Sequence, residues 1–427
     1  MRVCLVGFGK SNSALVDIIL DKGNELCVSN NSKFSQETIE YFKNNNINYE
    51  EEHGELLKNT NLAIVSPGIK PTSDAAKIIF DNRINYTTEL EYSWMHMKRF
   101  NPKAKFIGVT GTNGKTTTTS LINHIIQISD KSTYKAGNIG IPLIHAPLNI
   151  DYYVLEVSSF QMFWSNRFFP DIAILLNLAP DHLNWHSSLE EYYNSKINMG
   201  IRSLNNYGKF ILNSGIDFEK NDNNLIQFSP LYNYKNKKVI YKNQEIKVDN
   251  NTLNLNIYRE NVIAAVSCLL ELNFDKDIIE KGIATFKPLA HRLENFAHVN
   301  NTFFINDSKA TNVHSAYNSY MSFRNKKYIA ILSGEPKNED MSNLIDELNN
   351  YSEQVFVFGD MVSEIKKYKF NDKFVFVNNL EDIVQYIKNI ESEFVVFSPS
   401  GASFDLFKNY EQRGYEFKKC ILENFKE

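Results

Sequence analysis

The sequence predicts a mixed α/β protein of three domains: a Rossmann-like N-terminal domain (residues 1–97), a central P-loop ATPase-type domain (98–288) and a Rossmann-like C-terminal domain (289–427). Short apolar runs alternate with helical stretches near both ends of the chain, which is the pattern of parallel sheets. A glycine-rich loop, GVTGTNGKT, occurs at residues 108–116. The length of 427 residues also exceeds what one compact core usually organises.

The N-terminal segment carries the strand and helix signals of a nucleotide-binding fold. Its predicted strands are Val3–Val6, Leu26–Val28 and Leu62–Val65, and its first predicted helix is Ala14–Leu20. Gly7-Phe-Gly9 follows the first strand, but Asn12 occupies the third glycine position of a dinucleotide fingerprint. This signal alone is compatible with a nucleotide-shaped ligand and with a Rossmann-like turn that binds nothing.

The central segment begins near Asn101-Pro102. We predict a strand over Lys105–Thr110 and a helix from Lys115, with an apolar face of Leu121, Ile122, Ile125 and Ile126. Two further buried strands are predicted over Tyr152–Val157 and Ile172–Leu176. The Asn-rich stretch Asp217–Leu255 reads as an irregular or antiparallel appendage.

Pro288 marks the next predicted boundary, after which the alternation of strands and helices resumes. Strands are predicted over Phe303–Ile305, Tyr328–Leu332, Val355–Phe358, Phe374–Val377 and Phe394–Phe397.

The glycine loop has the composition of a phosphate site. A strand, a glycine turn and a helix surround a phosphate with backbone N–H groups and a helix N-terminus. Lys115 can neutralise phosphate oxygens, and the Thr116 hydroxyl can bind Mg²⁺. Val109 stands where the strict Walker spacing needs glycine. A bare glycine turn with a surface lysine does not explain why four threonines follow Gly114-Lys115.

Acidic and imidazole side chains follow the next two strands. Glu156 closes one, and Asp181 with His182 follows the other, so all three should meet at the carboxyl edge of the sheet. A carboxylate there suits Mg²⁺. His182 and His186 have the spacing of a zinc-protease helix, but Leu183 replaces the glutamate. We therefore interpret His186 as a capping or surface residue.

Composition and charge exclude some classes of binding partner. The formal net charge is −4, which argues against broad binding to nucleic acid. The basic run Lys235–Lys242 reads as the edge of a solvated hairpin. Four dispersed cysteines indicate neither a metal site nor a disulfide framework. With no run of membrane-spanning length, we expect a cytoplasmic monomer that binds neither nucleic acid nor a membrane.

Seven motifs occur in order along the chain: TGTNGKT, GNIG, EVSSFQ, NLAPDH, AHR, NDSKATN and SPSGASFDLFKNYEQRG. Together they resemble the Mur ligase family, and the last two are most similar to the branch that adds D-glutamate. Another Mur-type or folylpolyglutamate-type ligase with a different amino acid acceptor is the alternative. A third hypothesis, from another functional class, is a nucleotide-dependent switch or binding module that uses the same loop.

The resemblance implies an ATP-dependent amide ligase of peptidoglycan precursor synthesis, and so of cell-wall biogenesis, cell shape and cell division. ATP would phosphorylate the terminal carboxylate of UDP-N-acetylmuramoyl-L-alanine, and the amine of D-glutamate would attack the acyl phosphate. Two Mg²⁺ ions would assist.

The same resemblance assigns roles to residues. Lys115, His182 and Lys196 would be catalytic. Metal ligands would be Thr116, Glu156, His182 and Lys196, the lysine as a carbamate. ATP would contact Gly111, Thr112, Asn113, Gly114, Lys115, Thr116, Thr117, Asn261, Arg292 and Asp307. The UDP-linked substrate would contact Ser11, Asn31, Ser32, Gly68 and Asn138. D-Glutamate would meet His182, Lys309, Thr311, Lys337, Ser403, Phe404 and Tyr410. Without the resemblance, Lys196 would read as an ordinary lysine on a helix surface.

Three stretches depart from the family pattern. Tyr258, Glu260 and Ala264 interrupt the motif expected around Asn261. Pro336 stands in the run Gly334–Lys337 where the family has glycine, and proline fixes φ there. Asn30, Asn31 and Ser32 replace the Asp, Thr and Arg expected near uracil.

Overall fold

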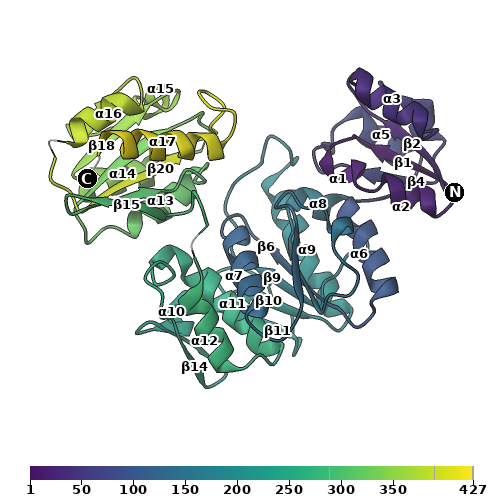
Figure 1. Cartoon of the computed structure of the whole chain (residues 1–427), viewed down its shortest axis with the longest axis horizontal. Coiled ribbons are helices and arrows are strands. Elements are labelled where there is room, and N and C mark those ends of the chain that lie inside the picture. Colours follow the sequence, from purple (N-terminus) through teal and green to yellow (C-terminus); the bar gives the residue numbers. More distant parts are fainter. Residues whose placement is uncertain (288, 338, 389, 426–427) are drawn as a thin grey trace. The chain divides into compact units, whose positions relative to one another are not determined.

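The structure is a computed structural model that describes residues 1–425 except Pro288, Asn338 and Asn389. The chain divides into two compact units. The first comprises residues 1–249 and 260–284, and the second comprises residues 250–259 and 285–427. The first unit holds two separate parallel sheets and a small antiparallel sheet, and the second holds one mixed sheet, so the predicted three-domain α/β class is confirmed (Figure 1).

The N-terminal sheet is parallel, with strand order β3-β2-β1-β4-β5. Val3, Leu5 and Val28 point to one face, under α2 and α3, while Cys4, Val6 and Cys27 point to the other, under α4 and α5. This alternation along each strand follows from the two-residue period of a pleated sheet. The elements are β1 (Arg2–Val6), α1 (Lys10–Ser13), α2 (Val16–Asp21), β2 (Glu25–Ser29), α3 (Gln36–Asn44), β3 (Asn48–Glu50), α4 (Glu55–Lys58), β4 (Leu62–Val65), α5 (Asp74–Asp81) and β5 (Asn85–Thr87).

Asn12, in α1, holds the turn that follows β1. Its buried side-chain amide donates to the carbonyl oxygens of Val6, Gly7 and Ile64 at 3.2, 2.9 and 3.0 Å. These bonds tie the turn after β1 to β4, which a glycine at this position could not do. The helix predicted over Ala14–Leu20 is confirmed as α2, which begins two residues later than predicted, whereas α1 was not predicted.

The central sheet has strand order β11-β10-β9-β6-β8-β7, and all its ladders are parallel. One face packs against α6 and α9 through an apolar cluster that includes Trp94, Phe106, Tyr153 and Met199. The predicted apolar face of α7 is buried, and Ile125 packs against Gly282 of α12. The elements are α6 (Glu89–Phe100), β6 (Lys105–Thr110), α7 (Lys115–Gln127), β7 (Thr133–Gly137), η1 (Leu143–His145), β8 (Tyr152–Glu156), α8 (Ser159–Trp164), β9 (Ile172–Leu175), α9 (Leu189–Asn205), β10 (Lys209–Asn213), β11 (Leu225–Phe228), η2 (Asn256–Tyr258), α11 (Arg259–Glu271) and α12 (Lys276–Thr285).

The predicted appendage is antiparallel only in part. A small sheet of order β12-β13-β14 follows α10 (Pro230–Asn233), and its strands are Tyr234–Lys235, Lys238–Tyr241 and Gln244–Lys247. Asn236 and Lys237 adopt positive φ at the first turn, so the basic run does form a hairpin. The residues of β11, however, extend the central parallel sheet instead.

The C-terminal sheet has strand order β15-β16-β20-β17-β18-β19, in which only β15 is antiparallel. All five predicted strands are confirmed. One face is covered by α16 and α17, through Ile383, Val384, Phe417 and Ile421. The elements are β15 (Glu294–Val299), β16 (Thr302–Asn306), α13 (Val313–Met321), β17 (Tyr328–Ser333), α14 (Ser342–Tyr351), β18 (Gln354–Phe358), α15 (Met361–Ile365), β19 (Phe374–Phe376), α16 (Leu380–Ile387), β20 (Phe394–Ser400) and α17 (Tyr410–Asn424).

The predicted domain limits at residues 97 and 288 stay predictions. Two observations concern them. Residue 97 lies inside α6, whose Leu90 and Met97 belong to the central core. The other limit falls on Pro288, which lies outside the described residues.

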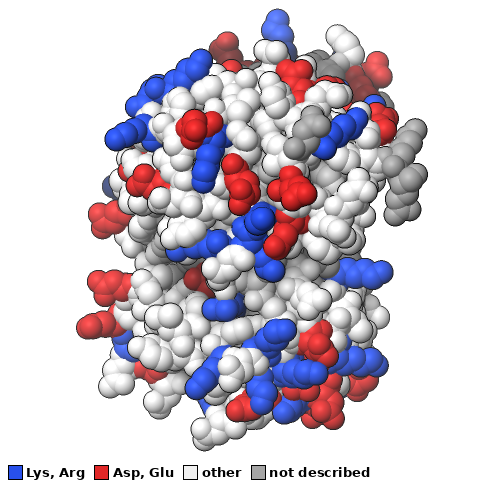
Figure 2. Space-filling view, turned by 90° about the vertical axis from the view of Figure 1, so that its left-hand side faces the viewer, with Lys and Arg blue, Asp and Glu red and all other residues white. Residues whose placement is uncertain are grey.

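Surface charge is mixed on the face that Figure 2 draws. Among the described residues on that face, lysine and arginine side chains alternate with aspartate and glutamate side chains. Within the described part of the chain, no helix is both long and apolar enough to cross a membrane.

Candidate active site

The loop between β6 and α7 has the geometry that a phosphate needs. Gly114 caps α7 with φ +82°, a left-handed conformation that glycine adopts without steric cost. The backbone N–H groups at the start of α7 form a positive helix terminus. In the structure the Lys115 ammonium donates to the carbonyl oxygens of Gly111 and Thr112 at 2.8 and 2.9 Å. Lys115 is thus folded back over its own loop.

Thr112 anchors the phosphate loop to neighbouring segments of the domain. Its hydroxyl lies 3.1 Å from Ala179 O and 3.1 Å from the Tyr192 hydroxyl, and it accepts from Ala179 N at 3.0 Å. Both Thr112 and Thr117 are buried. The loop is therefore anchored to the segment after β9 and to α9, which limits its movement.

Glu156 lies beside the loop at the end of β8. Its Oε2 accepts from the Thr116 hydroxyl at 2.6 Å, and its Oε1 accepts from the Asn138 amide at 3.0 Å. The carboxylate is 4% exposed, which contradicts the alternative of a surface glutamate. Thr116, Glu156 and Asn138 come from three different segments of the chain, and the carboxyl edge of the sheet brings them together.

Lys196 is buried in α9 with only 1% of its surface exposed. Its Nζ donates to Gly111 O at 2.8 Å and lies 4.8 Å from the centre of the Tyr192 ring. Burial, and then the nearby Lys115, hold the pKa of this amine well below its usual range. The alternative of a surface lysine is excluded by the burial.

Asp181 and His182 follow β9 at the same edge. His182 N donates to Asp181 Oδ1 at 2.8 Å, and the His182 ring lies between Phe160 and Tyr192, with centroids 4.8 and 5.9 Å away. His182 adopts φ +57°. A left-handed residue other than glycine is unusual and is common at functional sites.

Glu260, one of the residues that interrupt the expected motif, accepts hydrogen bonds that the sequence did not predict. It accepts from the side-chain amides of Asn177 and Asn213 at 2.9 Å each, and burial raises its pKa. Asn177 Oδ1 in turn accepts from Asn113 N at 2.9 Å. Glu260 thereby supports the loop through Asn177, while Asn261 Nδ2 donates to Gly114 O at 2.9 Å.

The interpretation of His186 as a capping or surface residue is wrong. His186 is 3% exposed, and its two ring nitrogens lie 3.0 Å from Glu191 Oε1 and 3.0 Å from Ser159 Oγ. No group of three or more His, Cys, Asp or Glu side chains within the described residues could hold a metal ion by itself. One carboxylate with one hydroxyl still fits Mg²⁺, which binds few protein oxygens and keeps water and substrate phosphates as its other ligands.

In the second unit, Asp307 lies in a buried polar cluster. It accepts from Leu293 N at 3.1 Å and from the hydroxyls of Ser319 and Ser398 at 2.6 and 2.8 Å. Burial raises its pKa to about 6. The neighbouring Arg292 offers its carbonyl oxygen to the Tyr258 hydroxyl at 2.7 Å. Tyr258, a departure from the family pattern, therefore ties η2 to the segment before β15.

Arg413 is a residue that the sequence-based assignments missed. Its guanidinium is fully buried and donates to Ser308 Oγ, Ser308 O and Gly401 O at 3.0, 2.8 and 3.0 Å. The loop after β17 joins the same assembly, because Glu335 and Ala402 exchange two backbone hydrogen bonds. Arg413 thus holds together the loops that carry NDSKATN and SPSGAS.

The residues predicted for D-glutamate belong to these loops, apart from His182. Lys309 Nζ lies 3.9 Å from the centre of the Tyr410 ring. Ser403 is 3% exposed, whereas Phe404 is 72% exposed. Thr311 is half-buried and Lys337 is exposed. No contact among the described residues distinguishes Phe404 as a binding residue.

The residues predicted for the UDP-linked substrate lie at the carboxyl edge of the N-terminal sheet, except Asn138, which follows β7. Ser11 lies in α1, and the others lie in loops. Ser11 is half-buried, whereas Asn31, Ser32 and Gly68 are exposed. Asn30 donates to the carbonyl and hydroxyl oxygens of Ser32 at 3.1 and 2.9 Å, so this loop is held by its own bonds.

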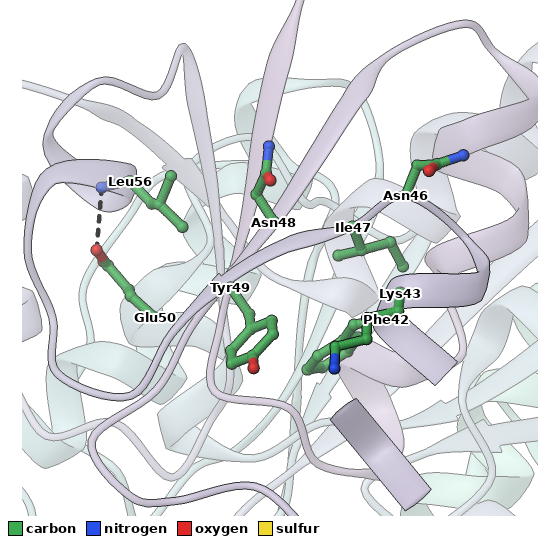
Figure 3. A pocket seen from close by; sticks show the side chains of 8 residues that line it. All are labelled: Phe42, Lys43, Asn46, Ile47, Asn48, Tyr49, Glu50 and Leu56. Atoms are coloured by element: carbon green, nitrogen blue, oxygen red, sulfur yellow. Dashed lines mark hydrogen bonds between the residues drawn. The ribbon is translucent and has the colours of Figure 1, made fainter. Parts of the chain in front are cut away.

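A surface hollow of about 760 Å³ lies at the outer edge of the same sheet, bordered by Phe42, Asn46, Asn48 and Tyr49 (Figure 3). None of the predicted site residues lines it.

The chain matches models of two protein-family domains. Residues 2–75 match the MurD N-terminal domain and residues 109–269 match the Mur ligase middle domain. The UDP-N-acetylmuramoylalanine--D-glutamate ligase of Petrotoga mobilis is 50% identical over 430 residues, which cover 99% of both chains. The chain belongs to the Mur ligase family. The equally named protein of Thermosipho africanus is 35% identical, again over 99% of both chains.

Solved structures of Mur ligases share the fold. Thermotoga maritima MurF in complex with ADP superposes with a TM-score of 0.64 at 16% identity, covering 99% of this chain and 94% of MurF. Thermotoga maritima MurC superposes with a TM-score of 0.58 at 19% identity, covering 99% of both chains. The Mur ligase fold therefore extends over almost the whole chain.

Proposed function

We infer that this Mur ligase is an ATP-dependent amide ligase that joins D-glutamate to UDP-N-acetylmuramoyl-L-alanine in peptidoglycan precursor synthesis. The observation that carries this inference is the 50% identity, over 99% of both chains, to a relative named for that activity. The phosphate loop agrees with it, because it provides a nucleotide site of the kind the activity requires.

The reaction transfers the γ-phosphoryl group of ATP to the terminal carboxylate of the UDP-linked substrate. The resulting acyl phosphate is attacked by the amine of D-glutamate, and the amide forms as phosphate leaves and the amine loses its proton. Two anions must be brought together for the first step, so charge neutralisation and positioning supply most of the catalysis. Lys115 would exchange its two carbonyl acceptors for phosphate oxygens when ATP binds.

We propose that Thr116 and Glu156 hold a Mg²⁺ ion shared with ATP, and that His182 and a modified Lys196 hold a second. Bound there, Mg²⁺ would neutralise phosphate charge. The support is chemical, because a carboxylate and a hydroxyl lie 2.6 Å apart beside the loop. Asn138 orients the same carboxylate from its other oxygen.

Lys196 would act as a carbamate, formed when its neutral amine attacks CO₂ and releases one proton. The burial of Lys196 favours the neutral amine that this step requires. The carbamate is an oxygen ligand, which suits Mg²⁺ better than an ammonium would. Gly111 O, the one acceptor of Nζ among the described residues, would remain within reach of the carbamate N–H.

D-Glutamate carries two carboxylates, and we propose that Lys309, Lys337, Thr311 and Ser403 bind them. Arg413 supports this role indirectly, because it fixes the loops of Lys309 and Ser403 to each other. Asn261, Arg292 and Asp307 would contact the nucleotide.

A substrate panel tests the function. The purified enzyme is combined with ATP and UDP-N-acetylmuramoyl-L-alanine, and phosphate release is measured with L- and D-glutamate, L-lysine, diaminopimelate and glycine. We expect release only with D-glutamate. A preference for L-lysine or diaminopimelate would overturn the choice of amino acid, and equal release without any amine would indicate a nucleotide switch instead of a ligase.

A further inference from the structure

The carboxyl edge of the N-terminal sheet forms one connected rim. Gly7 N donates to Ser29 O at 2.8 Å and Ser66 N donates to Val6 O at 2.9 Å, so the ends of β1, β2 and β4 are tied together. In a doubly wound sheet, ligands bind outside the carboxyl ends where the strand order reverses. Here that point lies between β1 and β4. None of the residues proposed so far explains how a uracil ring would be distinguished from other bases.

A hydrogen-bonded chain of Glu50, Ser29 and His53 lies on this rim. Ser29 Oγ is 2.7 Å from Glu50 Oε1 and 2.8 Å from His53 Nδ1. The Glu50 carboxylate already accepts backbone N–H bonds at the N-terminus of α4, at 2.8 to 3.2 Å, from Gly54, Leu56 and Leu57, and Figure 3 draws the bond from Leu56. All the contacts of Glu50 are therefore those of an acceptor.

This arrangement fixes the proton positions. A hydroxyl has one proton, and Ser29 must donate it to the Glu50 oxygen, since two acceptors would otherwise face each other at 2.7 Å. Ser29 can then only accept from His53, which places the imidazole proton on Nδ1. Burial lowers the pKa of His53 and outweighs the opposing effect of Glu50 and Asp74, so the ring is neutral at pH 7. His53 Nε2 consequently presents a lone pair.

That lone pair is open to a ligand. His53 is half-buried, and within the described residues its Nε2 has no hydrogen-bond partner and is not enclosed. The ring touches Ser29 at the end of β2, and it feels the charge of Asp74 at the start of α5. It therefore lies between the loop after β2 and the segment after β4.

We propose that His53 Nε2 accepts a hydrogen bond from the N3–H of the uracil ring, and that the chain Glu50–Ser29–His53 selects uridine over cytidine. The proposal rests on the proposed function, because a UDP-linked substrate brings the uracil ring to the enzyme. Uracil N3 carries a proton, whereas cytosine N3 is an acceptor that would face the lone pair of Nε2. A site built to pair one hydrogen-bonding group rejects the analogue that lacks it.

The test compares UDP and CDP as competitive inhibitors against UDP-N-acetylmuramoyl-L-alanine in the full enzyme. We expect UDP to bind the wild type about tenfold more tightly than CDP, which is the effect of about one hydrogen bond. UDP would make this bond through its N3 proton, whereas CDP would place an acceptor against His53 Nε2. In His53→Phe this ratio should fall to about one. The KM for the UDP-linked substrate should rise about tenfold, while kcat and the KM for ATP stay within about twofold. A third probe, 3-methyl-UDP, lacks the N3 proton and should inhibit the variant and the wild type equally weakly.

His298→Phe is the matched control, because His298 is an exposed histidine on β15 and no role is proposed for it. It should keep the wild-type ratio. An unchanged ratio of UDP to CDP in His53→Phe, or a fall in kcat without a change in KM, would overturn the assignment of His53. A wild-type enzyme that does not turn over the UDP-linked substrate would overturn the proposed function instead, so the two failures are distinguishable.

Discussion

The buried amine of Lys196 donates a hydrogen bond to the carbonyl oxygen of Gly111, 2.8 Å away in the phosphate loop. This bond joins α9 to the loop before α7 across 85 residues of sequence. It places the lysine proposed for carbamylation beside the loop that is proposed to bind the phosphates of ATP.

Removing CO₂ should lower the activity of the enzyme, because Lys196 would then remain an amine, which offers Mg²⁺ no anionic oxygen ligand. Activity measured in CO₂-depleted buffer should recover when bicarbonate is added. Lys196→Ala and Lys196→Arg should both be nearly inactive, and acetate should partly restore only the alanine variant by occupying the vacated ligand position. Wild-type rates in either variant would show that Lys196 is structural.

Lys115→Ala should lower kcat by at least about 100-fold, since it removes positive charge from the transferring phosphoryl group. Circular dichroism should show that the fold survives, because Lys115 is half-buried and donates to carbonyl oxygens of its own loop. Activity within about tenfold of wild type, equivalent to about 1.4 kcal/mol, would contradict the role of the loop.

Lys337→Ala should raise the KM for D-glutamate far more than the KM for ATP, because the side chain is exposed and would pair with a substrate carboxylate. Steady-state kinetics with each substrate varied in turn would measure the two effects. The control is Lys326→Ala, whose lysine lies 3.5 Å from Glu393 and has no proposed role. Equal changes in both KM values would remove Lys337 from the D-glutamate site.

Gly334→Ala should destabilise the second unit by about 3 kcal/mol. Gly334 has φ +102°, and an added Cβ would collide with the Ala402 carbonyl oxygen and the Arg413 guanidinium. Gly23→Ala is the control, since Gly23 has φ +69° but open space around it, and only the conformational cost of about 1 kcal/mol should appear. Thermal unfolding of both variants tests the difference.

The stability of the second unit should contain a pH-dependent contribution from Asp307. Burial raises the pKa of this carboxyl group to about 6 in the folded state, above its ordinary value of 3.8. The folded state therefore binds the proton more tightly, and the stabilisation is complete below about pH 4 and is lost as the pH rises through about 6. The loss is on the order of 2 kcal/mol. Urea unfolding at pH 4.5 and 7.5 measures the free energy of unfolding of the wild type and of Asp307→Asn. The decrease between the two pH values that Asp307 causes in the wild type should be absent from the variant.

Local sequence patterns were sufficient for the phosphate loop and for many of the strands, but they missed β3, β5, β7, β10 and β15. β6 and the start of α7 lie where the apolar run and the glycine spacing predicted them. The same reasoning missed α1, in which Asn12 makes bonds to β1 and β4 that no local pattern encodes. It also misread His186, whose burial depends on Ser159 and Glu191.

The sequence by itself determined the α/β class, the phosphate loop and the family, since each depends on residue types at fixed short spacings. Only the tertiary structure decided that Lys196 is buried against Gly111, that Glu260 supports the loop through Asn177, and that Arg413 joins two loops. It likewise decided which nitrogen of His53 is free. The physical reason is that burial, proton position and hydrogen-bond partners depend on groups far apart in the chain, which meet only when the sheets have formed.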